Sequence, residues 1–255
     1  MTDPSSPLSP SLRLAANLST LFQELPFEAR PRAAQACGFA GLEVQFPYDL
    51  SAAQWQAAVG RSGLPMVLLN APKGKNGEPG LASLADRKDE FLSSLRVAAE
   101  YAAALDCPLV HVLAGIGGDR SCYLENLALA RDIVAPAGAT VVIEVLNQID
   151  VPGYHLRSIA DAQQVIDAVP GIGLQYDLYH AARSHEDIPA TLRNLRSSPS
   201  HVQISSCPGR NEPDHTTLID LQYVIDMGYC GWVGCEYWPA STTRAGLGWA
   251  ASLAG

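Results

Sequence analysis

The stretch TVVIEVL at residues 140–146 is a run of β-branched and aliphatic residues that holds a single acid, Glu144. The same pattern recurs in three later stretches, each with an acidic or amide side chain near its end: Asp177 in IGLQYDLY (172–179), Gln203 in HVQISSC (201–207) and Glu236 in WVGCEYW (232–238). A bare carboxylate inside such a strand costs several kcal/mol unless a partner neutralises it. Four oxygen-bearing side chains at matching places in four strands therefore suggest that a divalent cation is the shared partner.

Eight short apolar runs alternate along the chain with longer segments that have the spacing of amphipathic helices. We expect strands at 12–18, 41–46, 65–70, 109–115, 140–146, 172–178, 200–206 and 232–237. Helices are expected at 27–36, 85–105, 121–135, 158–169, 189–196, 220–227 and 242–253. Another helix opens after the second strand with Ser51 and Gln54 in a capping-box arrangement, which Ser158 and Asp161 repeat. This order predicts a single closed parallel (β/α)₈ barrel, a TIM barrel, over 12–255, preceded by a flexible tail at 1–11.

Alternation along the strands gives the four polar residues a common face. One face of each strand in a barrel points at the axis, and if it is this face, the four groups converge at the mouth of the barrel. Three carboxylates and one amide oxygen suit Mg²⁺ or Mn²⁺ better than zinc, which favours His and Cys. An alternative without metal, in which neighbouring strands hydrogen-bond each acid, stays open. We expect no nucleotide cofactor.

Composition limits the partners of this chain. With 17 basic and 26 acidic residues the formal net charge is −9, which disfavours nucleic acid and anionic membrane but not a small anionic substrate. No apolar run approaches about 18 residues, so no transmembrane helix is expected. The six cysteines form no CxxC pair. We do not expect the start MTDPSSPLSPSL to be a signal peptide, because it has neither a basic region nor an apolar core. We expect a cytoplasmic protein with free thiols; a homo-oligomer remains open.

The chain resembles the hydroxypyruvate isomerase family, which is made of metal-dependent TIM barrels of the xylose isomerase-like superfamily. The resemblance is carried by AANLSTLF (15–22), GLEVQFPYD (41–49), IEVLNQIDVPGYHL (143–156), QYDLYH (175–180), HVQIS (201–205), PGRNEPD (208–214), GYCGWVGCEYWP (228–239) and AGLGW (245–249). The NAP of 70–72 and the EPD of 212–214 are closer to the 2-oxo-tetronate isomerases. The resemblance implies an aldose–ketose isomerase of small hydroxy-oxo acids, with 2-oxo-tetronate or hydroxypyruvate as substrate.

By this resemblance Glu144, Asp177, Gln203 and Glu236 match the metal ligands, and Glu144 and Glu236 also match the acid/base pair. Isomerisation needs a proton removed alpha to a carbonyl and one returned at the neighbouring carbon, through an enediolate. Two carboxylates on opposite sides of those carbons can do both.

Four further residues are candidates for binding the substrate. His180, three residues past Asp177, would hydrogen-bond a substrate oxygen, or else be a capping or loop histidine. The planar fork of Arg210 matches a substrate carboxylate, although a solvated loop arginine fits the sequence equally. Asn70 and Asn147 could bind hydroxyls or serve as turn residues.

Two loops depart from the family pattern. The chain has DHTT at 214–217 where the family usually has GTGE, and PKGKNGEPG at 72–80 is shorter than usual. We expect both segments to be loops over the substrate, so a change in specificity or weaker activity is open. Other readings are a sugar epimerase or dehydratase of the same superfamily, a non-catalytic sugar-acid-binding barrel, and an apurinic endonuclease. The last needs several zinc ions, many histidines and a basic groove.

Overall fold

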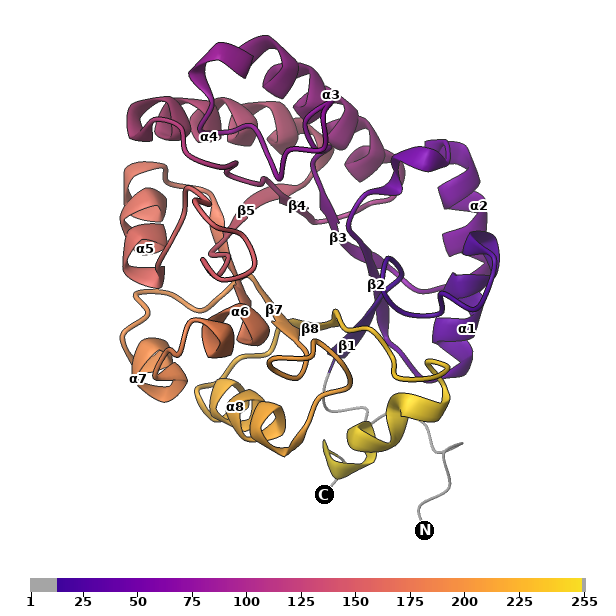
Figure 1. Cartoon of the computed structure of the whole chain (residues 1–255). Coiled ribbons are helices and arrows are strands. Elements are labelled where there is room, and N and C mark those ends of the chain that lie inside the picture. Colours follow the sequence, from indigo (N-terminus) through magenta and orange to yellow (C-terminus); the bar gives the residue numbers. More distant parts are fainter. Residues whose placement is uncertain (1–12, 254–255) are drawn as a thin grey trace.

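Eight parallel strands form a closed barrel in the order in which they occur in the chain (Figure 1). This computed structural model describes residues 13–253, so the expected tail at 1–11 lies outside the described residues. The strands are β1 Arg13–Asn17, β2 Gly41–Val44, β3 Met66–Asn70, β4 Leu109–His111, β5 Thr140–Glu144, β6 Gly173–Asp177, β7 His201–Ile204 and β8 Trp232–Cys235. β8 pairs with β1 and closes the sheet. The predicted (β/α)₈ barrel is confirmed, with strands shorter than the apolar runs.

A ring of helices surrounds the barrel (Figure 1). The α-helices are α1 Arg30–Ala36, α2 Ala52–Ser62, α3 Lys88–Ala104, α4 Arg120–Val134, α5 Ile159–Ala168, α6 Leu178–Arg183, α7 Ile188–Arg193 and α8 His215–Asp226. Short 3₁₀ turns are η1 Phe27–Ala29, η2 Pro47–Asp49, η3 Ala85–Arg87, η4 Ala135–Ala137 and η5 Ala245–Leu253. The last of these takes the place of the helix expected at 242–253, and α6 was not predicted.

Helix caps explain where the boundaries fall. Ser51 and Gln54 form the expected reciprocal capping box of α2, whereas Ser158 accepts only one backbone bond at α5. The helix expected at 220–227 begins at His215, because the Asp214 side chain accepts from the backbone N–H of Thr217 and starts α8 there. The departing segment 214–217 is therefore a helix start, and the expectation that it is a loop was wrong.

Two layers of side chains fill the inside of the barrel. The deeper layer is an apolar cluster that packs against Trp232 and consists of Ala15, Val67, Leu68, Leu109 and Val142. Residues two positions apart on a strand share a face, and the residues two positions after four of these are all polar and buried: Asn17, Asn70, His111 and Glu144. A polar layer therefore lies directly above an apolar floor, towards the strand ends. The larger core lies between sheet and helices.

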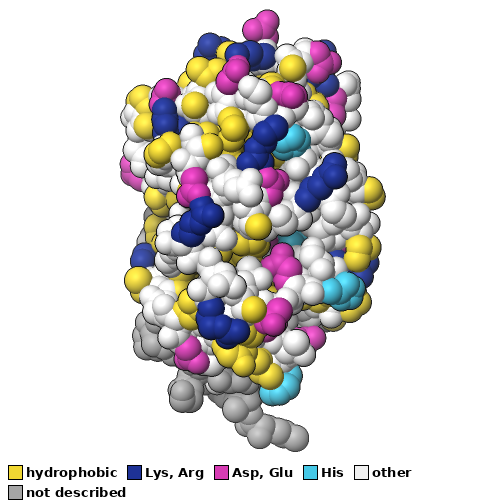
Figure 2. Space-filling view, turned by 90° about the vertical axis from the view of Figure 1, so that its left-hand side faces the viewer, with side chains coloured by type: hydrophobic (Ala, Val, Ile, Leu, Met, Phe, Trp, Pro, Cys, Tyr) yellow, Lys and Arg dark blue, Asp and Glu magenta, His cyan; other side chains and the backbone are white. Residues whose placement is uncertain are grey.

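The outer surface mixes charges of both signs. On the face that carries α5 and α7, basic and acidic side chains are scattered singly among apolar and neutral ones (Figure 2). This face shows no broad basic stripe of the kind that tracks a phosphate backbone. Among the described residues, no helix has the length and apolar character needed to cross a bilayer.

Candidate active site

The four predicted oxygen donors lie at the mouth of the barrel, where the strands end. Glu144 and Asp177 are the last residues of β5 and β6, Gln203 lies within β7, and Glu236 directly follows β8. All four are buried, with at most 7% of each residue exposed. Asp177 and Gln203 are direct partners in the register of β6 and β7. Strand ends far apart in the sequence therefore bring these side chains to one place.

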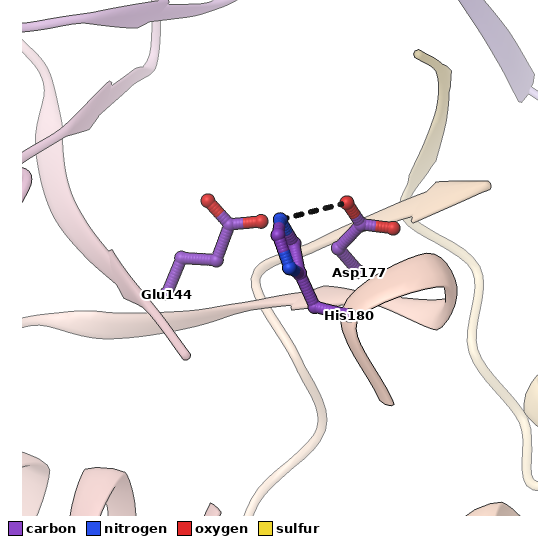
Figure 3. Close-up of side chains that lie close together, drawn as sticks. All are labelled: Glu144, Asp177 and His180. Atoms are coloured by element: carbon purple, nitrogen blue, oxygen red, sulfur yellow. Dashed lines mark ion pairs between the residues drawn. The ribbon is translucent and has the colours of Figure 1, made fainter. Parts of the chain in front are cut away.

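Glu144, Asp177 and His180 form one half of the site. One potential ligand atom from each lies within 4.8 Å of the others, and Figure 3 shows the His180 ring between the two carboxylates. Asp177 ends β6 and also caps α6, because its Oδ1 oxygen accepts from the backbone N–H of Tyr179 at 2.8 Å. His180 comes three residues after Asp177, on the same side of this first helical turn, and its Nε2 nitrogen lies 3.8 Å from Asp177 Oδ2.

Hydrogen bonds from Asn147 determine what His180 can do. The backbone N–H of Asn147 donates to His180 Nδ1 at 3.1 Å, and the Asn147 side-chain nitrogen lies 2.7 Å from the same atom. We infer that Nδ1 carries no proton and that Nε2 carries it. Burial lowers the pKa of His180 to about 4, against the opposing effect of Asp177. A neutral ring with Nε2–H is a hydrogen-bond donor, which suits a substrate oxygen better than a metal.

Arg210 links the other half of the site to the first. It follows β7 and has a left-handed backbone with φ of 52°, which turns its guanidinium back over the mouth. Its Nη2 nitrogen donates to Asp177 Oδ2 at 3.2 Å and also to Glu236 Oε1. The guanidinium carbon lies 4.7 Å from the centre of the Tyr179 ring, in cation–π geometry. Arg210 is therefore an ordered part of the site, and not a solvated loop residue.

Three side-chain amides hydrogen-bond to the Glu236 carboxylate. Asn17 Nδ2 and Gln203 Nε2 donate to Glu236 Oε2 at 2.8 and 2.9 Å. On the other oxygen, Gln45 Nε2 donates to Oε1 at 3.0 Å. The Gln203 oxygen faces the opposite way and accepts from Gln175 Nε2 at 2.8 Å. Glu236 is thus held in one orientation, with Oε1 on the side of Arg210.

Both predicted acid/base residues have raised pKa values. Burial raises the pKa of Glu144 well above its usual value, and the charges of Asp177 and Glu236 raise it further. Burial also raises the pKa of Glu236 to about 7, although Arg210 opposes the shift. Two carboxyl groups with raised pKa values are suited to proton transfer.

The donor set fits a hard divalent cation. Glu144, Asp177 and Glu236 can carry three negative charges, and within residues 13–253 Arg210 is the one Lys or Arg that pairs with them. The amide oxygen of Gln203 keeps a lone pair beyond the one used by Gln175. Carboxylate and amide oxygens are the ligands that Mg²⁺ and Mn²⁺ prefer. The surplus of negative charge in a buried place is what such an ion would offset.

The two asparagines differ in how they are used. The Asn147 Oδ1 oxygen accepts from the backbone N–H of Ile149 and Asp150, at 3.1 and 2.8 Å, so this side chain makes a turn and supports His180. Asn70 ends β3 with 8% of the residue exposed, and its backbone carbonyl accepts from the Tyr48 hydroxyl at 2.5 Å. Asn70 therefore remains the freer of the two for a substrate hydroxyl.

The β3 loop at 71–82 is tied to its neighbour. Gly80 pairs with Ala114 in an isolated bridge. The φ of Gly80 is +100°, and a Cβ at this residue would lie 2.2 Å from the Leu113 carbonyl oxygen. Only glycine therefore allows the backbone at residue 80 to come this close to Leu113. Lys73 lies over the Phe46 ring at 4.6 Å. The short loop is therefore packed against the β2 and β4 loops.

Several residues of the site were not singled out from the sequence. Asn17 and Gln45 contact Glu236, and Tyr179 supports Arg210. His111 Nδ1 lies 3.6 Å from Glu144 Oε2, and within the described chain neither of its ring nitrogens has a hydrogen-bond partner. Period-two alternation could have identified Asn17 and His111, because each occupies the inward place at the end of its strand.

Comparisons with known proteins show which sequences and structures the chain is similar to. Residues 31–253 match the family model described as xylose isomerase-like TIM barrel. The chain is 40% identical over 252 residues to the 2-oxo-tetronate isomerase of Cupriavidus necator, covering 93% of this chain and 96% of that protein. It is 36% identical over 253 residues to the hydroxypyruvate isomerase of Escherichia coli, covering 93% and 98%.

A solved structure is similar over the same length. A crystal structure described as an AP endonuclease, family 2, from Brucella melitensis superposes with a TM-score of 0.88 at 39% identity, covering 94% of this chain and 98% of that one. The barrel fold is therefore shared with this solved structure over nearly the whole of both chains.

Proposed function

This chain belongs to the hydroxypyruvate isomerase family of xylose isomerase-like TIM barrels, and we propose that it interconverts small hydroxy-oxo acids, such as 2-oxo-tetronate or hydroxypyruvate, by proton transfer. The observation that carries the proposal is the pair of buried carboxyl groups, Glu144 and Glu236, which have raised pKa values. Glu144 lies near Asp177, and Arg210 joins Asp177 to Glu236. Such a pair can remove a proton from one carbon and return one at the next.

A divalent cation, Mg²⁺ or Mn²⁺, completes the proposed site. Glu144, Asp177, Gln203 and Glu236 would hold it through their oxygens. When bound, the ion would polarise the substrate carbonyl and stabilise the negative charge of the enediolate. One of Glu144 and Glu236, as a carboxylate, would take the proton from one carbon, and the other, as a carboxylic acid, would give a proton to the next; their different surroundings keep their proton affinities apart.

Arg210 and His180 give the proposed site its preference for an acid substrate. The guanidinium already binds two carboxylates, Asp177 and Glu236, and its remaining N–H groups can take a third from the substrate. His180 Nε2–H would donate to a substrate oxygen, while Asn147 keeps the ring in that tautomer. Asn70 would contact a hydroxyl. Each of these contacts orients the substrate without taking part in the proton transfer.

The test is a panel of three- and four-carbon oxo acids, each incubated with the protein and Mn²⁺ and followed by proton NMR. We expect interconversion of hydroxypyruvate with tartronate semialdehyde, or of 2-oxo-tetronate with its isomer, and no product with Glu236→Gln. A panel in which all of these acids stay unchanged contradicts the proposal. An inverted stereocentre or a lost water, in place of a moved carbonyl, would favour an epimerase or a dehydratase.

An endonuclease activity is not favoured, although the similar Brucella structure carries that description. The net charge of −9 opposes binding to a phosphate backbone. Among the described residues, the group of His, Cys, Asp and Glu that could hold a metal contains one histidine, His180. That composition is far from a site for several zinc ions.

A further inference from the structure

Glu43 is a buried acid below the site that the proposed chemistry does not use. It lies in β2 and is fully buried, and its side chain reaches across the barrel to β7 and β8. Gly234 in β8 leaves the space: a Cβ there would lie 2.3 Å from Glu43 Oε2. On the far side, His201 Nε2 lies 2.7 Å from the same oxygen. A carboxylate placed this deep needs its partners, because an unpaired charge here would be strongly destabilising.

Two amide groups join Glu43 to Glu236. The Glu43 Oε1 oxygen accepts from Asn17 Nδ2 at 3.0 Å and from Gln203 Nε2 at 2.9 Å. The same two nitrogens donate to Glu236 Oε2, at 2.8 and 2.9 Å. Each NH₂ group therefore bridges the deep carboxylate and the one at the mouth.

The direction of these bonds determines where the amide oxygens lie. Both amide nitrogens donate to Glu43 Oε1, so the oxygen of each amide faces away from Glu43. The Gln203 oxygen accordingly lies towards Gln175 in β6, and the Asn17 oxygen accepts from the backbone N–H of Ser19 at 2.9 Å. A turn of the Gln203 amide would bring its oxygen against two carboxylates.

We propose that Glu43 is a positioning residue that orients the Gln203 amide, so that its oxygen faces the cation and its nitrogen restrains Glu236. This inference rests on the proposed function for the presence of the cation. Glu43 touches neither substrate nor cation; it acts through Gln203 and Asn17. Partners of this kind commonly change metal affinity by about 10- to 100-fold.

The test is a double-mutant cycle on Mn²⁺ affinity, measured by calorimetry without substrate. In Glu43→Gln the Gln203 amide should lose its preference for one orientation, because a neutral amide at position 43 can donate as well as accept. We therefore expect Mn²⁺ to bind about 10- to 100-fold more weakly. In Gln203→Glu the orientation of the side chain no longer matters, since both terminal atoms of a carboxylate are oxygens and either can face the cation. In that background, Glu43→Gln should cost little affinity or even improve it.

Two results with the variants would overturn the inference. One is an unchanged Mn²⁺ affinity in Glu43→Gln; the other is an equal loss of affinity on Glu43→Gln in the wild-type and Gln203→Glu backgrounds, which would indicate a merely structural role. Wild-type protein that binds no Mn²⁺ would overturn it too. Thermal unfolding of each variant separates lost affinity from lost folding. The substrate panel decides the proposed function separately, because wild-type protein that binds Mn²⁺ but converts no oxo acid contradicts the function and leaves the role of Glu43 standing.

Discussion

The Arg210 Nη2 nitrogen lies 3.2 Å from Asp177 Oδ2 and donates in addition to Glu236 Oε1, so one guanidinium bridges the carboxylate that ends β6 and the one that directly follows β8. Burial by itself would lower the Arg210 pKa, but the charges of Glu236 and Asp177 raise it above its usual value. The charge is therefore permanent. It offsets part of the negative charge at the mouth and leaves the edge of the guanidinium for an anionic substrate.

Replacing Arg210 should weaken catalysis on acid substrates. Arg210→Gln removes one partner of a partly buried charge pair, and we expect kcat/KM to fall by at least about 30-fold, equivalent to about 2 kcal/mol. Arg210→Lys keeps the charge without the fork and should lose less. The control is Arg120→Gln, which breaks an ion pair with Asp161 on the outer helices. Steady-state kinetics in which Arg210→Gln matches this control would contradict the role of Arg210.

The Tyr179 ring should matter more than its hydroxyl. The ring supports Arg210 at 4.7 Å, and the hydroxyl donates to Asp150 Oδ2 at 2.5 Å. Tyr179→Leu removes the cation–π contact, which is worth about 0.5–2 kcal/mol, so the KM for the acid should rise up to roughly 30-fold. Tyr179→Phe keeps the ring and serves as the matched variant. Equal KM values for the two variants would show that the ring does not hold Arg210.

Mn²⁺ affinity should increase with pH. The pKa of Glu144 is raised well above its usual value and that of Glu236 to about 7, mainly by burial, so protons compete with the cation for these carboxyl groups. Below these pKa values the affinity should fall by roughly tenfold per pH unit for each proton released. Calorimetry in buffers of different ionisation heat counts those protons, and Glu236→Gln should lower the count. An affinity that is flat from about pH 5.5 to about pH 8 is the opposing result.

Replacing Gly80 and Gly60 with alanine should change the free energy of unfolding in opposite directions. Gly80 has a φ of +100° and faces the Leu113 carbonyl, so Gly80→Ala should lower the free energy of unfolding by at least about 1–3 kcal/mol. Gly60 lies on the exposed side of α2, with no heavy atom within 4 Å of an added Cβ. Gly60→Ala should raise that free energy by roughly 0.5–1 kcal/mol. Urea unfolding of both variants is the measurement, and a Gly80→Ala protein as stable as wild type would refute the tight approach.

The sequence predicts the barrel because apolar runs and polar strand ends are local signals. In β5, for example, Val142 belongs to the apolar floor and Glu144, two positions later on the same face, belongs to the polar layer at the mouth. The helix boundaries were less predictable. Asp177 ends β6 and also caps α6, and Asp214 starts α8 earlier than the apolar spacing predicts.

The contacts across the barrel could not be read from the sequence. Glu43 meets His201, 158 residues later, and Asn17 meets Glu236, 219 residues later. These pairs depend on the tilt and stagger of the strands, which no local pattern records. The return of Arg210 over the mouth depends likewise on one left-handed residue in a loop.

The measurement that tests the central claim most directly is solvent isotope exchange. With Mn²⁺ and substrate in D₂O, Glu144 and Glu236 should exchange their protons with solvent between removal and return, so deuterium should enter the carbon alpha to the carbonyl. Glu144→Gln and Glu236→Gln should each abolish this incorporation while the protein stays folded. Turnover without any deuterium at that carbon, or undiminished incorporation in both variants, would contradict proton transfer by this pair.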